Sequence, residues 1–163
     1  MPNDKGLLEV FGRRPSVLFV DDEENIRTLL SMALDSKGFK VTAAGTVPEA
    51  LRLISSEPFD VLIADLNIGN AGDGFTVVSA MRRTQPKAAT FILTGYPAFE
   101  TALQAIRQQV DDYLIKPTDV DTVAEKIQIN TRQNTQSPAD PPASGRYGSA
   151  KPRRHHRKVA RRG

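Results

Sequence analysis

Cysteine is absent from the 163-residue sequence, and no apolar run approaches the length needed to cross a bilayer. Without cysteine the chain can form no disulfides and has no thiol chemistry, which is typical of proteins in a reducing cytoplasm. Residues 1–5, MPNDK, do not resemble the start of a secretory signal. From these absences we expect a cytoplasmic protein that has no membrane partner.

Acidic and basic residues are unevenly distributed along the chain. Residues 1–126 hold 13 Lys and Arg against 18 Asp and Glu, whereas residues 127–163 hold 9 against 1. The formal net charge of +3 therefore combines −5 in the first part with +8 in the second. A chain of this length supports one domain with a sizeable core and some additional sequence. We therefore expect an acidic domain with a basic tail.

Four short apolar runs, near residues 17–20, 59–64, 90–93 and 112–115, end abruptly in polar side chains. Continuous apolar runs of this kind are typical of strands that are buried on both faces of a parallel sheet. In such a sheet, ligands bind outside the carboxyl ends of the strands. The polar residues that follow the four runs, and that we expect at this edge, are Asp21, Asp22, Asp65, Thr94 and Lys116.

The chemistry of these five side chains is complementary. Three carboxylates favour a divalent cation, whereas a hydroxyl group and an ammonium group favour an anion. The sequence therefore predicts a magnesium and phosphoryl site at one edge of the sheet.

Segments with helical periodicity alternate with the strands. After the first strand, apolar residues recur at three- and four-residue spacing and predict an amphipathic helix with one buried face, formed by Ile26, Leu29, Leu30, Ala33 and Leu34. Residues 39–44 alternate in polarity and predict an edge strand. Five strand–helix units predict an α/β fold with a doubly wound, five-stranded parallel sheet and right-handed crossovers. The alternation alone is also typical of a flavodoxin.

The order of these motifs resembles the receiver domain of two-component response regulators. The matching pieces are Asp21-Asp22-Glu23, Asp65, Thr94-Gly95 and the segment from Tyr113 to Pro117. The resemblance covers residues 16–127 and implies the flavodoxin-like strand order 2-1-3-4-5. It also implies a phosphorelay switch that receives a phosphoryl group from a sensor histidine kinase or a histidine phosphotransfer protein. Such a switch is no enzyme in the usual sense, because it catalyses only its own phosphorylation and dephosphorylation.

The resemblance assigns a role to each residue of the predicted site. Asp65 is the phosphoacceptor, because a carboxylate can act as a nucleophile and form an acyl-phosphate. Asp22 binds Mg²⁺ directly and Asp21 binds it largely through water, while Asp65 and the backbone carbonyl of Asn67 are the other members of the metal site. Lys116 binds a phosphoryl oxygen, and receivers commonly have a cis peptide bond after this lysine.

Two further residues occupy switch positions of the family. The Thr94 hydroxyl can turn towards a phosphoryl oxygen. Tyr113 occupies the position of the switch aromatic, although an amphipathic tyrosine at the edge of the core is an equally good interpretation. The last two strand–helix units are a candidate surface for a homodimer.

The loop after Asp65 departs from the family pattern. Gly69 stands where receivers usually have proline, and the loop is one residue longer before Asp73-Gly74. Three glycines in six residues predict a looser backbone. Tyr96 is bulky for the rim of the site and is expected to shield the acyl-phosphate from water.

We divide the chain into a flexible lead-in (1–15), a receiver domain (16–130) and a disordered basic tail (131–163). Residues 131–150 contain no aliphatic residue larger than alanine apart from proline, and seven of the last thirteen residues are Lys or Arg. Basic clusters bind phosphate backbones, so the alternative function is a nucleic-acid-binding protein that uses the receiver fold as a scaffold. A flavodoxin-like cofactor binder remains a third interpretation, but acidic residues 21–24 would repel its phosphate.

Overall fold

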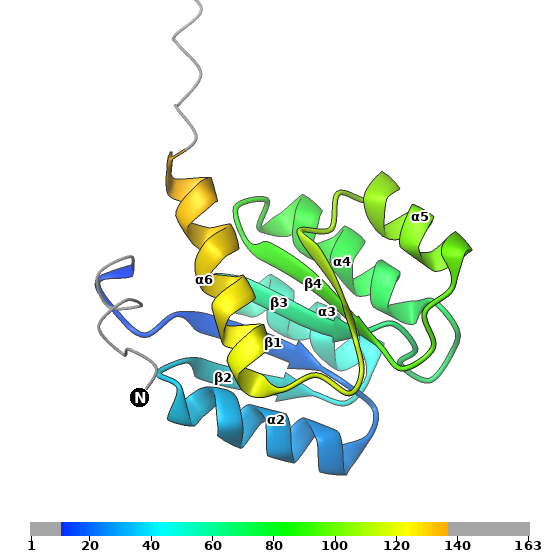
Figure 1. Ribbon diagram of the computed structural model, residues 1–163, viewed down its shortest axis with the longest axis horizontal. Helices are drawn as coiled ribbons and strands as arrows, with labels where there is room; N and C mark the ends of the chain where they lie inside the picture. The colour runs from blue at the N-terminus through cyan, green and yellow to red at the C-terminus, as the bar shows by residue number, and fades with distance from the viewer. Residues whose placement is uncertain (1–10, 137–163) are drawn as a thin grey trace, which may run out of the picture.

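The computed structural model describes residues 11–136, with side chains through Arg132. Five parallel strands form one sheet in the order β2-β1-β3-β4-β5 (Figure 1). This arrangement confirms the predicted doubly wound sheet and its strand order. The strands are β1 (Ser16–Val20), β2 (Lys40–Ala44), β3 (Val61–Asp65), β4 (Ala89–Thr94) and β5 (Asp112–Ile115).

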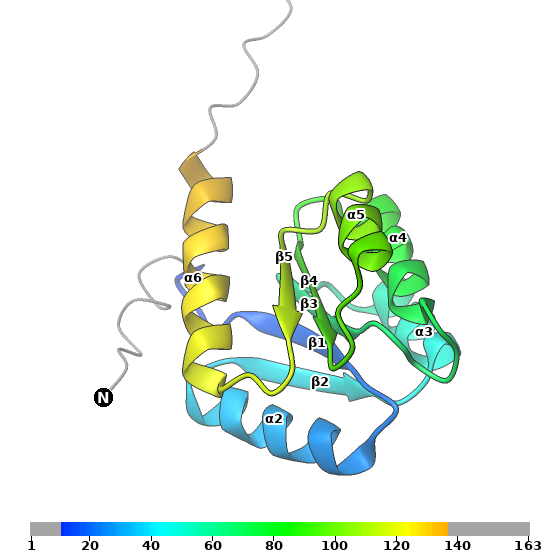
Figure 2. The ribbon, with the colours of Figure 1, turned by 45° about the vertical axis from the view of Figure 1, so that its right-hand side comes forward.

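Helices cover both faces of the sheet (Figures 1 and 2). Helices α3 (Val47–Ser56), α4 (Asp73–Thr84) and α5 (Phe99–Arg107) lie on one face, and α2 (Glu24–Ser36) and α6 (Val120–Gln136) lie on the other. Successive strand side chains point to opposite faces. In β1, for example, Leu18 and Val20 join one core cluster while Val17 and Phe19 join the other. The sequence of β1 is therefore apolar without alternation because both of its faces are buried.

The register of the strands aligns their polar ends. Val20 of β1 pairs with Ala64 of β3, so the residues that follow them, Asp21 and Asp65, reach the same edge. On the other side of β3, Thr94 at the end of β4 pairs with Ile115 of β5. Lys116 follows Ile115 and is brought to this edge as well.

Helix α2 has the predicted extent but not the predicted burial. Of the five apolar residues expected on its buried face, only Leu34 is buried, and the Leu29 side chain is 68% exposed. Helix α6 meets α2 near the C-terminal end of α2, where Lys37 and Asp121 form an ion pair. Towards the N-terminal end of α2, the helix and segment 116–120 enclose a mainly apolar groove of about 530 Å³.

The first strand begins at Ser16, where the predicted receiver domain begins, whereas the last helix extends past its predicted end at residue 130. Helix α6 continues to Gln136, six residues beyond the predicted boundary, and within this extension the buried Thr131 hydroxyl donates to the Ile127 carbonyl 2.7 Å away. Within the predicted lead-in, Arg13 forms a bidentate pair with Asp60 at 2.8 and 2.9 Å. The remainder of the lead-in (1–10) and of the tail (137–163) lies outside the described residues. Between residues 11 and 136, no helix is both long and apolar enough to cross a membrane.

Candidate functional site

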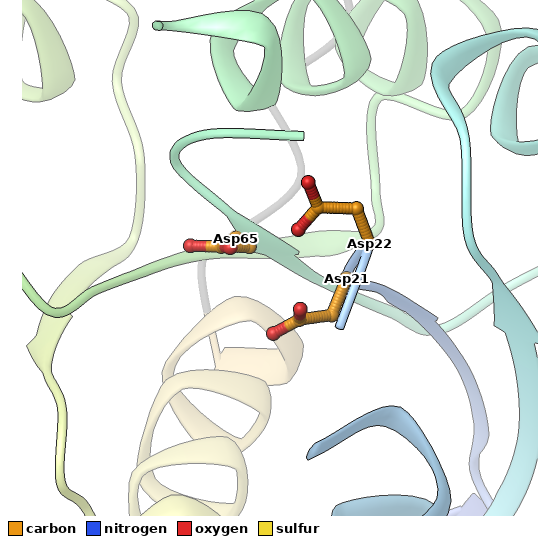
Figure 3. A group of neighbouring side chains, drawn as sticks. All are labelled: Asp21, Asp22 and Asp65. Atoms are coloured by element: carbon orange, nitrogen blue, oxygen red, sulfur yellow. The ribbon is translucent and has the colours of Figure 1, made fainter. Parts of the chain in front are cut away.

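Three carboxylates meet at the C-terminal edge of the sheet (Figure 3). Asp21 and Asp22 follow β1 directly, and Asp65 is the last residue of β3. Each of them offers an oxygen atom within 4.8 Å of those of the other two. Asp21 and Asp65 are buried, whereas Asp22 is exposed. The predicted acidic cluster is therefore present, with one of its three members facing solvent.

The Lys116 ammonium group joins two of these carboxylates. Its Nζ atom lies 2.9 Å from Oδ2 of Asp21 and 3.4 Å from Oδ2 of Asp65. The Lys116 amide also donates to the Thr94 carbonyl at 2.7 Å, and the following Lys116–Pro117 bond is cis. The structure therefore brings Lys116 into the acidic cluster, as the strand ends predicted.

The electrostatics of Asp65 and Lys116 are coupled. Burial raises the pKa of Asp65 above its usual value, while the charge of Lys116 opposes the rise and that of Asp21 adds to it. Burial lowers the pKa of Lys116, but the hydrogen bond and charge of Asp21, together with the charge of Asp65, outweigh it, so this pKa lies above its usual value. Lys116 is therefore a cation at neutral pH.

Asp21 is held by its neighbours more completely than the sequence indicates. Its Oδ1 atom accepts the Glu23 amide hydrogen at 2.9 Å, and its Oδ2 atom accepts from Lys116. The Arg27 side chain, on α2, donates to the Asp21 backbone carbonyl at 2.7 Å. Sequence reasoning did not identify Arg27, because no spacing relates a helix residue to the backbone of a preceding strand end.

The loop after Asp65, for which three glycines predict a looser backbone, is held by several hydrogen bonds. The Asn67 side chain accepts the Gly72 amide hydrogen at 3.1 Å, and the Asp73 side chain accepts those of the Asn70 backbone and side chain at 3.1 and 3.2 Å. A Cβ atom on Gly74 would lie 2.2 Å from the Asp65 carbonyl oxygen, so only glycine fits there. The positive φ angles of Gly69 and Gly72 and the close approach at Gly74 place the glycines in a hydrogen-bonded turn.

The two switch residues lie outside the acidic cluster. The Thr94 hydroxyl is buried and accepts the Tyr96 amide hydrogen at 3.1 Å. The Tyr113 side chain is half-buried, and its hydroxyl lies 2.8 Å from that of Thr101 on α5. Tyr96 is 83% exposed. The Thr101 contact was not predicted, because a threonine in the first turn of a helix gives no signal for it.

Residues 17–128 match the response regulator receiver domain family, and the chain belongs to this family. Family membership makes it a receiver of two-component phosphorelay signalling, a class that interacts with sensor histidine kinases. The predicted family, fold and class of function are therefore confirmed. The comparisons do not favour the alternative of a nucleic-acid-binding protein that uses the receiver fold as a scaffold.

Two curated relatives illustrate how much of a longer protein the chain matches. The photosynthetic apparatus regulatory protein RegA of Rhodovulum sulfidophilum is 33% identical over 135 residues, which cover 83% of this chain and 73% of RegA. The response regulator protein PilR of Pseudomonas aeruginosa is 30% identical over 131 residues, which cover 78% of this chain but 29% of PilR.

Two solved structures share the fold. A response regulator from Burkholderia pseudomallei, described with a phosphorylated aspartic acid, a calcium ion and citrate, has a TM-score of 0.67 at 32% identity and covers 74% of this chain and 71% of its own. A CheY-like receiver domain from Methanospirillum hungatei has a TM-score of 0.70 at 24% identity and covers 75% of this chain and 97% of its own. The second similarity bears on the fold alone.

Proposed function

We propose that Asp65 accepts a phosphoryl group from a phosphohistidine of a sensor histidine kinase or a histidine phosphotransfer protein. A carboxylate oxygen of Asp65 attacks phosphorus, the O–P bond forms as the N–P bond breaks, and the released imidazole nitrogen takes up a proton. The position of Lys116, 2.9 Å from Asp21 and 3.4 Å from Asp65, is the observation that carries this assignment. Its charge is placed to bind an oxygen of the transferred group.

The proposed metal ligands are four oxygen donors, the carboxylates of Asp21, Asp22 and Asp65 and the backbone carbonyl of Asn67. These hard donors fit Mg²⁺, which takes few carboxylates and retains several waters. When bound, Mg²⁺ neutralises charge on the phosphoryl group. Both oxygens of Asp21 already accept hydrogen bonds, which supports a water-mediated role for Asp21 and direct coordination by Asp22 and Asp65.

We propose Thr94 and Tyr113 as the switch. Phosphorylation adds acceptor oxygens beside β4, and the Thr94 hydroxyl, now bonded to the Tyr96 amide, exchanges that contact for a phosphoryl oxygen. The loop between β4 and α5 then loses one of its anchors. Tyr113 responds through Thr101, because their hydroxyl groups connect β5 to the first turn of α5.

Two apolar surfaces support two kinds of protein contact. The groove between α2 and segment 116–120 lies beside Lys116, and we propose that the phosphodonor protein docks there. The last two strand–helix units expose Phe99 (77%) and Ile106 (72%), and we propose this surface for a homodimer.

The remaining assignments concern the chain as a whole. We propose a cytoplasmic protein whose only reactions are its own phosphorylation and dephosphorylation. We also retain the division into a lead-in, a receiver domain and a basic tail, with the receiver domain extended to the end of α6 at Gln136.

The test is phosphorylation of the full chain with acetyl phosphate and Mg²⁺, measured by intact mass. The wild type should gain one phosphoryl group, and Asp65→Asn should gain none, because an amide is a poor nucleophile. Glu24→Ala, a change at an exposed acid of α2, is the control and should behave as the wild type. Wild-type labelling of Asp65→Asn would show that another residue is the acceptor.

A further inference from the structure

The exposed carboxylate of the acidic cluster is bound to the loop that follows Asp65. Oδ2 of Asp22 accepts the backbone amide hydrogen of Gly69 at 3.0 Å, across 47 residues of sequence. Asp22 lies at the end of β1, and Gly69 lies in the connection between β3 and α4. This bond therefore joins two separate segments of the site.

The amide at position 69 can donate because the residue is not proline, and the backbone conformation at this position favours glycine. Its φ angle is +84°, a conformation that glycine adopts without a steric penalty and that proline cannot adopt. Proline would also lack the N–H group. Glycine at this position, where the resemblance leads one to expect proline, therefore supplies a hydrogen-bond donor to the site.

The rest of the loop holds the Gly69 amide in place. The Ile68 side chain is buried in the core next to it. On the other side of Gly69, Asp73 accepts the Asn70 amide hydrogen at 3.1 Å, and the Gly74 amide donates to the Leu66 carbonyl at 2.9 Å. The donor is therefore fixed before a cation binds, and an exposed carboxylate that pairs with it loses rotational freedom in advance.

We infer that the Gly69 amide is a positioning group for the metal site, which orients the Asp22 carboxylate towards a divalent cation. This inference rests on the proposed metal-binding function. Gly69 occupies one lone pair of Oδ2, and the remaining lone pairs of the Asp22 carboxylate are available to the cation. The loop then sets two of the four proposed ligands, the Asn67 carbonyl directly and Asp22 through Gly69. Hydrogen-bond partners of metal ligands orient them and raise metal affinity in this way.

The sharpest test replaces the N–H group of Gly69 with an oxygen atom that cannot donate a hydrogen bond. Glycolic acid in place of Gly69 converts its peptide bond to an ester in the full chain and leaves the side chain unchanged. We expect Mg²⁺ to bind the unphosphorylated ester variant about tenfold more weakly than the wild type, as measured by titration of amide chemical shifts. The matched control is the same ester at Gly38, which also has a positive φ angle and whose amide donates to the Asp35 carbonyl at the end of α2, away from the proposed metal ligands. Its Mg²⁺ affinity should stay within about twofold of the wild type.

A second measurement examines the hydrogen bond without metal. In metal-free Asp22→Ala protein, the Gly69 amide should exchange its hydrogen at least about tenfold faster than in the wild type, since it has lost its acceptor. The Asn70 amide, which Asp73 holds, should exchange at an unchanged rate. Equal exchange of Gly69 in both proteins would overturn the inference, and so would equal Mg²⁺ affinity of the Gly69 ester and the wild type.

These outcomes are distinct from a failure of the proposed phosphoryl transfer. Weak Mg²⁺ binding by the Gly69 ester together with no phosphorylation of Asp65 in the wild type would retain the inference and overturn the phosphoacceptor assignment. Normal phosphorylation of wild-type Asp65 together with full Mg²⁺ affinity of the Gly69 ester would do the reverse.

Discussion

Asp65 combines two properties that oppose each other in an ordinary carboxylate, since it must be ionised to react and it is buried at the end of a strand. Burial raises its pKa, and the ammonium group of Lys116 offsets only part of that effect. Ionisation of Asp65 therefore costs folding free energy. Because the pKa of Asp65 is raised in the folded state, the neutral carboxyl group favours folding. This contribution to stability is fully present below the ordinary pKa of about 3.8 and is lost as pH rises through the pKa of the folded state.

The first prediction follows from the raised pKa of Asp65. Asp65→Asn should raise the thermal midpoint at pH 7 by a few degrees in the absence of Mg²⁺, because the variant removes a buried charge. The advantage should shrink as pH falls towards the ordinary pKa of aspartate, where the wild-type side chain is neutral as well. Scanning calorimetry between pH 3.5 and pH 7 provides the measurement.

Its control is Glu125→Gln, which removes an exposed carboxylate from α6 and should leave the pH dependence of the midpoint unchanged. Addition of Mg²⁺ should then stabilise the wild type more than Asp65→Asn, since ligand binding to the folded state raises its stability. A lower midpoint for Asp65→Asn at pH 7 would contradict the assigned cost of ionisation.

The second prediction concerns Thr94. Thr94→Ala should still be phosphorylated at Asp65, because the hydroxyl is not the nucleophile. Amide shifts across residues 96–107 and at Tyr113 should nevertheless move less on addition of beryllofluoride and Mg²⁺ than in the wild type. A ligand shifts an equilibrium only through contacts that differ between the two states, and the Thr94 hydroxyl supplies such a contact. Equal shifts in both proteins would remove Thr94 from the switch.

The sequence predicted the charged residues of the site but not the backbone groups that hold them. Sequence reasoning could identify Asp21, Asp65 and Lys116, because strand ends in a parallel sheet must meet at one edge. Sequence reasoning could not identify the Gly69 amide, because every residue except proline has an N–H group. Only the folded conformation of the loop directs the N–H group of Gly69 towards Asp22. The glycines of that loop were seen, but their number alone does not distinguish a tight turn from a flexible one.

At the scale of elements, the hydroxyl groups of Tyr113 and Thr101 link β5 to the first turn of α5. The Thr101 hydroxyl donates to the Ala98 carbonyl at 2.9 Å, so the Tyr113 hydroxyl, 2.8 Å away, is the donor of the pair. A chain of hydrogen bonds therefore runs from β5 through Thr101 to the residue that precedes α5.

The third prediction tests this connection. Tyr113→Phe should lower the free energy of unfolding by about 1 kcal/mol, the usual net value of such a hydrogen bond, as measured by urea denaturation. Amide shifts should change at the start of α5 and not at α3. Tyr96→Phe, which removes an exposed hydroxyl, is the matched control and should leave stability unchanged. Equal stability of Tyr113→Phe and the wild type would favour a solvated tyrosine at the edge of the core.

Helix periodicity predicts which residues share a face, but not whether another element covers that face. The α2 stripe of Ile26, Leu29 and Leu30 has the spacing of a buried face, yet Leu29 is exposed because α6 meets α2 near its other end. The end of α6 shows a similar limit of sequence reasoning. The polar residues after Ile129 favoured a tail, whereas the helix continues through Thr131, which is buried and donates its hydroxyl hydrogen to the Ile127 carbonyl.

At the scale of the whole molecule, the chain links an acidic receiver to a basic C-terminal segment. Residues 137–163 carry eight Lys and Arg against one Asp, whereas residues 1–126 carry a net charge of −5. A tethered partner has an effective concentration in the millimolar range, so on charge alone we expect the segment to compete with Mg²⁺ for the acidic edge at Asp21, Asp22 and Glu23. The competition is electrostatic and should depend on salt, because the Debye length falls from about 30 Å at 0.01 M to about 10 Å at 0.1 M.

The last prediction compares two truncations of this molecule. Deletion of Ser137–Gly163 should leave the thermal midpoint and the phosphorylation of Asp65 unchanged, because this segment contains only one Val and one Tyr as large apolar residues. It should tighten Mg²⁺ binding at low ionic strength and have no effect at about 0.5 M salt.

Deletion from Thr131 should instead lower the midpoint, because it removes a buried residue and the last turns of α6. Mg²⁺ titrations at two salt concentrations test the competition, and calorimetry on both variants tests where the domain ends. Equal midpoints for the two deletions would place the end of the domain at residue 130, and a salt-independent gain in Mg²⁺ affinity would contradict the electrostatic origin of the competition.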